Sequence, residues 1–343
     1  MADSNRAVLV VGGTGPTGPC IVNRLLAEGR DVTIYHSGRH EVEFDRPVEH
    51  LHGDPRDPAD IAAVLGDRHW DIAVLTSGRL KALAETLAGR CRRLVGITGQ
   101  PVYRGTMAPT PGGRLPLPVP EWAERQRDRA DYTGKVAEGE DQLMLQHGRG
   151  DFEATVVRYP GVYGPRCILA HEWAIVKRLI DGRRAMVMPG AGMAYFQRGF
   201  VENLGQMVYL AATRPEASGQ FFNAGDERVL SARHVAEIVS AELNLPLECV
   251  DIPAHWCRGF YPLAQKSSLV LDSAKSRSLL GYRDVVDVAD ATARTARWLW
   301  ENRPADVSPA FGGSFDYDRE DAIISAWREL SVAAEERLGL GKD

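Results

Sequence analysis

The chain has 343 residues, of which 44% are hydrophobic, 25% are charged and 34 are glycine. This composition excludes collagen-like and disordered chains, and it is sufficient for a large hydrophobic core in one or two domains. The 41 basic and 46 acidic side chains give a net charge of −5, so we expect neither nucleic acid nor a membrane surface as a partner.

The N-terminus begins with polar residues and continues with an apolar run that is too short for a signal peptide or a transmembrane helix. We therefore predict a cytoplasmic protein. Its five cysteines are scattered and form no CxxC pair, so we expect reduced thiols and no metal site.

The first half of the chain alternates short strand-like runs with helical segments. The predicted strands are residues 7–11, 31–35, 48–52, 72–75, 94–98 and 154–158. Strands separated by helices predict βαβ units and therefore a doubly wound parallel sheet, the Rossmann-type α/β fold. We assign residues 1–165 to this domain.

Residues 101–120 contain six prolines and three glycines, a composition that predicts a long loop over the carboxyl edge of the sheet, of the kind that forms lids. Helical patterns then dominate, around 171–181, 202–213, 231–243, 289–300 and 318–338. Residues 166–343 are accordingly predicted to form a smaller, mostly helical substrate-binding domain, from which a last strand near 220–223 returns to the sheet.

A glycine-rich turn follows the first strand directly and leads into an amphipathic helix. Its predicted cofactor contacts are Gly12, Thr14, Gly15, Pro16, Thr17 and Gly18. Glycines in such a turn let the backbone approach a pyrophosphate, and the helix N-terminus supplies amides and a partial positive charge. The arrangement predicts a dinucleotide-binding site.

The end of the second strand commonly carries an acid that binds the adenosine ribose of NAD. This chain instead has His36 and Arg39 within Tyr35-His36-Ser37-Gly38-Arg39-His40. Basic groups suit a 2′-phosphate, so we predict NADP(H) in preference to NAD(H). Asp54 follows the third strand, where it either contacts the adenine or forms a turn before Pro55.

Four segments resemble the extended short-chain dehydrogenase/reductase family, also called the NAD-dependent epimerase/dehydratase family. They are VVGGTGPTG at 10–18, HLHGDPRD at 50–57, RYPGVYGPR at 158–166 and LDSAKSRSLLGY at 271–282. The resemblance implies a dinucleotide bound across the sheet, with Pro160 and Val162 beside the nicotinamide. It also implies a substrate under the second domain, where Tyr163, Arg166 and His171 are candidate contacts.

The family uses a Ser or Thr hydroxyl to hold the substrate oxygen and a Tyr as acid/base. A Lys four residues later lowers the pKa of that Tyr and binds the nicotinamide ribose. Here Gly99 occupies the usual hydroxyl position, and Thr98 replaces it only if the strand end is irregular. Tyr132 and Lys135 are three residues apart, and because residues three apart are still helical neighbours, we expect them to cooperate if the helix begins between them. Tyr103 is the alternative acid/base.

Two histidines, His50 and His52, point to the same side of a predicted strand, but no third ligand is spaced with them. We therefore interpret them as solvated or packing residues.

Three functions are compatible with these features. The first is an NADP(H)-dependent oxidoreductase, an enzyme that transfers hydride to or from a small polar or polycyclic metabolite. The alternatives are a nucleotide-sugar epimerase or dehydratase with bound NAD, and a non-catalytic NADP-binding sensor or scaffold. The family resemblance adds the expectation of a homodimer.

Overall fold

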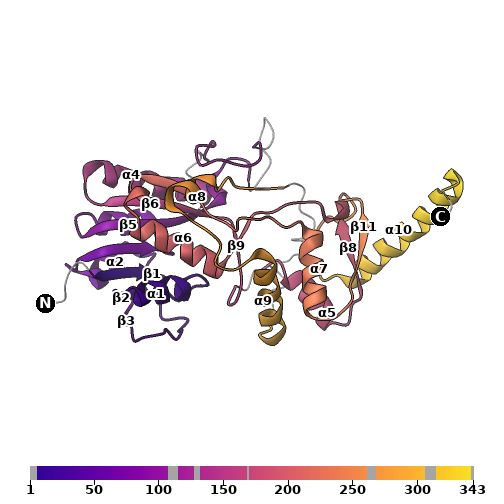
Figure 1. The fold of residues 1–343 in the computed structure, drawn as a ribbon, viewed down its shortest axis with the longest axis horizontal. Helices are drawn as coiled ribbons and strands as arrows, with labels where there is room; N and C mark the ends of the chain where they lie inside the picture. Colours follow the sequence, from indigo (N-terminus) through magenta and orange to yellow (C-terminus); the bar gives the residue numbers. More distant parts are fainter. Residues whose placement is uncertain are drawn as a thin grey trace. The chain divides into compact units, whose positions relative to one another are not determined.

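A computed structural model describes residues 6–106, 115–126, 132–167, 170–260, 268–305 and 314–340. The chain divides into two compact units (Figure 1). The first comprises residues 1–162, 197–227 and 269–286, and the second comprises residues 163–196, 228–268 and 287–343.

The first unit contains a seven-stranded parallel sheet in the order β10-β6-β5-β4-β1-β2-β3. Its strands are β1 (Ala7–Val11), β2 (Asp31–His36), β3 (Glu49–His52), β4 (Trp70–Leu75), β5 (Cys91–Gly99), β6 (Glu153–Tyr159) and β10 (Gln220–Asn223). The chain order reverses between β1 and β4, which is the point where ligands bind in sheets of this type. The predicted doubly wound parallel fold is confirmed.

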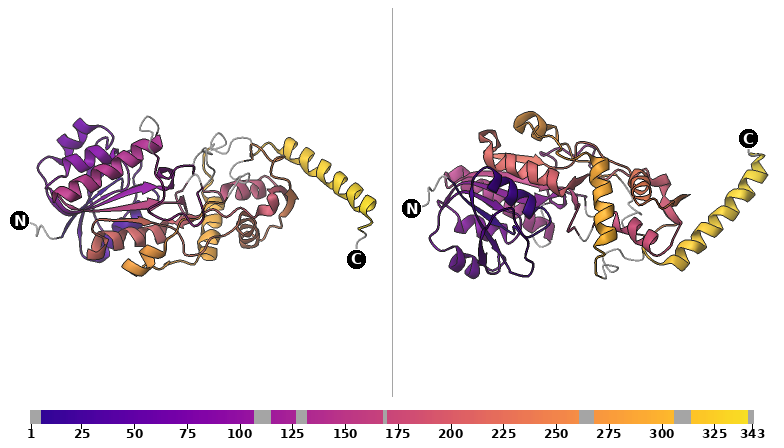
Figure 2. Two further views of the ribbon diagram at one scale, coloured as in Figure 1. Left: turned by 90° about the horizontal axis from the view of Figure 1, so that it is seen from above. Right: turned by 60° about the horizontal axis from the view of Figure 1, so that its bottom comes forward.

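Helices cover both faces of this sheet because successive side chains of each strand point to opposite sides. Val8 and Val10 of β1 pack with α1 (Gly18–Ala27) and α6 (Val201–Thr213), and α8 (Ala274–Leu280) also contributes to this layer. Leu9 and Val11 pack with α2 (Pro58–Leu65), α3 (Leu80–Thr86) and α4 (Tyr132–Arg149) on the other face (Figure 2).

The described parts of the proline-rich segment are packed rather than loose. A short 3-10 helix, η1 (Gln100–Val102), follows β5, and the buried Val102, Tyr103 and Val119 share a small core with Ala137 of α4. The backbone of Val119 pairs with that of Val270 and bridges to Leu271. Residues 107–114 lie outside the described part, so the lid stays a prediction.

The second unit is mainly helical, as predicted. It contains α5 (Trp173–Ile180), α7 (Ala232–Glu242), α9 (Val288–Glu301) and α10 (Tyr317–Leu338), with the two parallel strands β8 (Ala185–Pro189) and β11 (Glu248–Ile252). The fully buried guanidinium of Arg178 on α5 binds the carboxylate of Glu320 on α10 at 3.1 Å. Glu320 also accepts the backbone N–H of Val187, so one buried ion pair joins α5, α10 and β8. Among the described helices, none has the length and apolar character needed to span a membrane.

Candidate cofactor and active site

The glycine-rich turn connects the end of β1 to the start of α1. Gly12 has a φ of +82°, and its N–H donates to the carbonyl of Tyr35 at 2.9 Å. A Cβ at Gly12 would collide with the side chains of Thr76 and Ser77, and a Cβ at Gly18 would collide with the backbone carbonyl of Gly13. The packing of the protein itself therefore requires glycine at these two positions.

Gly15 is different. A Cβ there would meet only the carbonyl oxygen of Gly12, at an ordinary 3.5 Å, and its φ lies outside the left-handed region. No contact within the protein therefore requires glycine at this position, whereas close approach of a pyrophosphate to the backbone would require it. Thr14 and Pro16 lie beside it in the turn, and Thr17 precedes the first residue of α1. The turn fits a bound dinucleotide.

Replacing Gly15 by Ala is thus expected to weaken NAD binding by about tenfold or more while the free energy of unfolding stays near the wild-type value. Calorimetric titration with NAD and urea unfolding measure the two quantities. Gly148→Ala is the matched control for NAD affinity, because a Cβ at this exposed position near the end of α4 would have nothing within 4 Å in the protein. Unchanged NAD affinity in Gly15→Ala would show that the turn does not hold the pyrophosphate.

The corner at the end of β2 differs in charge from what the sequence suggests. His36 is only 3% exposed, and burial lowers its pKa even though Glu41 acts in the opposite direction. The carboxylate of Glu41 lies 4.0 Å from Nε2 of His36, so an acid is present at this corner after all. Arg39 is exposed. A neutral imidazole beside a carboxylate provides less attraction for a 2′-phosphate than two cations would.

Three further predicted cofactor residues follow strands of the sheet: Asp54 comes after β3, and Pro160 and Val162 come after β6. The carboxylate of Asp54 accepts a hydrogen bond from the backbone N–H of Arg56 at 2.9 Å. This contact is the one expected if Asp54 forms a turn. Pro160 is buried and Val162 is partly buried, directly after β6. Their contacts with a nucleotide stay predictions.

The catalytic pair predicted from the resemblance lies at the start of α4. The described part of this helix begins at Tyr132, so Tyr132 and Lys135 are both helical and three residues apart. Both side chains are exposed, Tyr132 to 73%. Residues three apart are helical neighbours, so the two side chains can act on one ligand.

Thr98 belongs to a buried polar network instead. The strand β5 is regular through Gly99, and Thr98 stands opposite Arg158 in the register with β6. The Thr98 hydroxyl donates to Glu140 Oε1 at 2.8 Å, and the Arg158 guanidinium binds both carboxylate oxygens of Glu140, at 2.9 and 2.7 Å. Arg125 adds a bond to Oε2 at 3.0 Å. The irregular strand end that would let Thr98 replace the missing hydroxyl is therefore not found.

Tyr103 lies in the same network. Its hydroxyl donates to Asn223 Oδ1 at 2.6 Å and accepts from Arg158 at 2.9 Å, and the side chain is 1% exposed. Burial raises the pKa of Tyr103, although Arg158 opposes the shift. A raised pKa lowers the fraction of Tyr103 present as phenolate near neutral pH, so less of it is available to act as a base. The catalytic roles of Thr98 and Tyr103 stay predictions.

One buried hydrogen-bonded network was not predicted from the sequence. It is formed by Glu140, Arg158, Arg125 and Asn223. One signal was present, since Glu140 continues the buried stripe of Gly134 and Ala137 at intervals of three on α4. An acid on a buried face requires a partner. The sequence could not identify that partner, because it comes from a neighbouring strand.

The three candidate substrate contacts belong to the second unit. Tyr163 is buried, Arg166 is exposed with a φ of +68°, and the His171 ring lies against Phe196 with the ring centroids 5.2 Å apart. Their binding roles stay predictions.

Several known proteins that are similar to the chain in sequence or structure are named as epimerases or were solved with a UDP-sugar. The chain is 26% identical to UDP-glucose 4-epimerase of Mycolicibacterium smegmatis over 327 residues, which cover 85% of this chain and 97% of that protein. Epimerase Mth375 of Methanothermobacter thermautotrophicus matches with a TM-score of 0.71 at 19% identity, over 87% of this chain and 93% of that one. MoeE5 in complex with UDP-glucuronic acid and NAD matches with a TM-score of 0.68 at 16% identity, over 86% and 99%. No protein-family model matches the chain.

The similarity in sequence to UDP-glucose 4-epimerase and in fold to Epimerase Mth375 agrees with the predicted resemblance to the extended short-chain dehydrogenase/reductase family and with the prediction of an enzyme. The similar structures whose cofactor is named contain NAD, which gives no support to the predicted preference for NADP.

Proposed function

We propose that the protein is an NAD-dependent enzyme of the epimerase type that acts on a nucleotide sugar. The observation that carries the proposal is the alignment with UDP-glucose 4-epimerase over nearly the full length of both chains. The glycine-rich turn between β1 and α1 supports the proposal. No contact within the protein requires glycine at position 15, whereas a pyrophosphate that lies close to the backbone would require it. This function was the alternative in the sequence reasoning, and it is now favoured over an NADP(H)-dependent reductase.

Each proposed role uses a residue of the first unit. The turn from Gly12 to Gly18 holds the cofactor pyrophosphate at the N-terminus of α1. Lys135 binds the nicotinamide ribose and carries a positive charge three residues from Tyr132 on the same helix. Tyr132 removes the proton from the sugar hydroxyl and later returns it. NAD, when bound, supplies a reversible hydride acceptor.

The choice of NAD is supported by the end of β2. Glu41 brings a carboxylate to His36, and the pKa of His36 is lowered by burial, so a 2′-phosphate would meet one exposed cation, Arg39. We expect NAD to bind more tightly than NADP. Arg39→Ala should change NAD affinity little.

The test is an epimerisation assay on the purified protein with NAD and, separately, UDP-glucose, UDP-galactose and UDP-glucuronic acid. Chromatography or NMR detects the epimer, and absorbance follows NADH. Epimer formation without net NADH release is the expected result. Net hydride transfer to added carbonyl compounds, with no epimer from any sugar nucleotide, would instead establish a reductase. NAD binding without any turnover would favour the non-catalytic alternative.

A further inference from the structure

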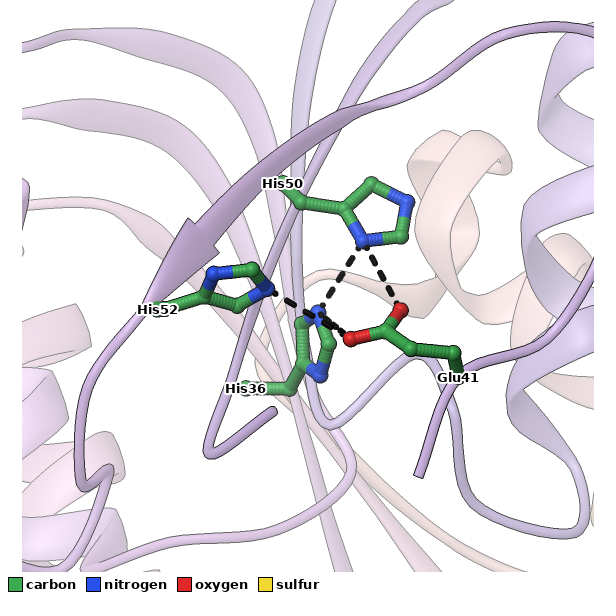
Figure 3. Close-up of side chains that lie close together, drawn as sticks. All are labelled: His36, Glu41, His50 and His52. Atoms are coloured by element: carbon green, nitrogen blue, oxygen red, sulfur yellow. Dashed lines mark hydrogen bonds and ion pairs between the residues drawn. The ribbon is translucent and has the colours of Figure 1, made fainter. Parts of the chain in front are cut away.

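Three histidines and one glutamate converge at the sheet edge formed by β3. In the register of β2 and β3, His36 stands opposite His52, and His50 lies two residues before His52. Residues two apart on a strand share a face, and so do directly paired residues on neighbouring strands. The three imidazoles therefore lie on one side of the sheet, and Glu41 from the segment after β2 reaches the same place (Figure 3).

The distances among the four potential donor atoms suit a metal ion. Nε2 of His36 and Nδ1 of His50 are 3.2 Å apart, and the Glu41 carboxylate lies 3.2 Å from His50 Nδ1 and 3.6 Å from His52 Nε2. All four donor atoms lie within 4.8 Å of one another. Ligands at the Zn–N and Zn–O distances of a tetrahedral site are separated by about 3.3 Å, so small side-chain movements would complete the site.

We propose that His36, His50, His52 and Glu41 bind a divalent transition-metal ion of the zinc type. Imidazole nitrogens with one carboxylate are a donor set suited to Zn²⁺, and four protein ligands are typical of a structural rather than a catalytic site. The ion would join the segment after β2 to the edge strand β3. The inference does not rest on the proposed function: its evidence is the distances among these four side chains, which include neither Tyr132 nor Lys135, and only the argument for NAD over NADP also uses His36 and Glu41.

Metal binding requires one rearrangement that can be read from the structure. Nδ1 of His36 accepts the backbone N–H of Gly38 at 3.3 Å, which leaves the ring proton on Nε2. Coordination through Nε2 moves that proton to Nδ1, so the bond from Gly38 must be given up. Gly38 is in an exposed turn with a φ of +71°.

The experiment uses the full chain without a histidine tag, freed of metal by a chelator. Calorimetry measures Zn²⁺ binding, and visible absorption of the Co²⁺ form reports the coordination geometry. We expect one ion per chain, the intense absorption of tetrahedral Co²⁺, and a higher melting temperature with Zn²⁺. His50→Gln and Glu41→Gln should each weaken Zn²⁺ binding, His50→Gln by more than about 100-fold.

His69→Gln is the matched control, because His69 is an exposed histidine whose Nδ1 lies 2.9 Å from the backbone carbonyl of Asp67, outside the cluster. It should bind Zn²⁺ like the wild type. Wild-type affinity in His50→Gln, the weak absorption of octahedral Co²⁺, or no stoichiometric binding would overturn the proposal. Since NAD and sugar are absent from these measurements, the result is independent of whether the protein is an epimerase.

Discussion

Glu140→Gln is expected to lower the free energy of unfolding by about 3–5 kcal/mol. Glu140 is fully buried and binds Arg158, which is 1% exposed, together with Arg125 and Thr98. Burial alone would lower the pKa of Arg158, but its bonds to Glu140 outweigh that effect and raise the pKa. Removal of the carboxylate charge leaves Arg158 charged in the interior without its counter-ion, which is the costly way to break a buried pair.

Urea unfolding of the purified variant measures this change. The matched control is Glu138→Gln, two residues earlier on the same helix, where Glu138 forms an exposed ion pair with Lys81 at 3.0 Å. Solvent screens that pair, so the control should leave the free energy of unfolding nearly unchanged. Equal, small effects of the two variants would mean that the Glu140 network contributes little to stability.

Tyr132→Phe is expected to reduce kcat for epimerisation by about 10²- to 10⁴-fold without changing NAD affinity, because the phenol acts only as an acid/base. Lys135→Met should both lower kcat and weaken NAD binding, since Lys135 is proposed to bind the ribose as well as to influence Tyr132. Steady-state kinetics and NAD titration separate the two variants.

Tyr103→Phe distinguishes the alternative acid/base. It removes the hydroxyl that joins Asn223 and Arg158, so it should lower the melting temperature while the folded fraction keeps its kcat. A folded Tyr103→Phe protein without activity, together with an active Tyr132→Phe protein, would transfer the acid/base role to Tyr103.

The central fold could be predicted from the sequence because its signals are local. The short apolar run of β1, the glycines at the β1–α1 turn and the helical periodicity in α5, α6, α7, α9 and α10 each depend on residues close together in the chain. The glycine-rich turn from Gly12 to Gly18 was found in the same way. The position of the Thr98 side chain was harder to predict, because it depends on whether β5 continues through Gly99. The end of a strand is determined by its pairing with the neighbouring strand, which the local sequence does not show.

The sequence by itself determined the parallel sheet, the glycine-rich turn between β1 and α1 and the position of Tyr132 three residues before Lys135. Only the tertiary structure decided which distant side chains meet: Glu140 with Arg158, Tyr103 with Asn223 across 120 positions, and His36 with His50 and His52. The physical reason is strand register for the histidines and the packing of α4 and of the segment after β5 against the sheet for Glu140 and Tyr103. Local periodicity gives the face on which a side chain lies, but the pairing of β2 with β3 and of β5 with β6 determines its neighbours.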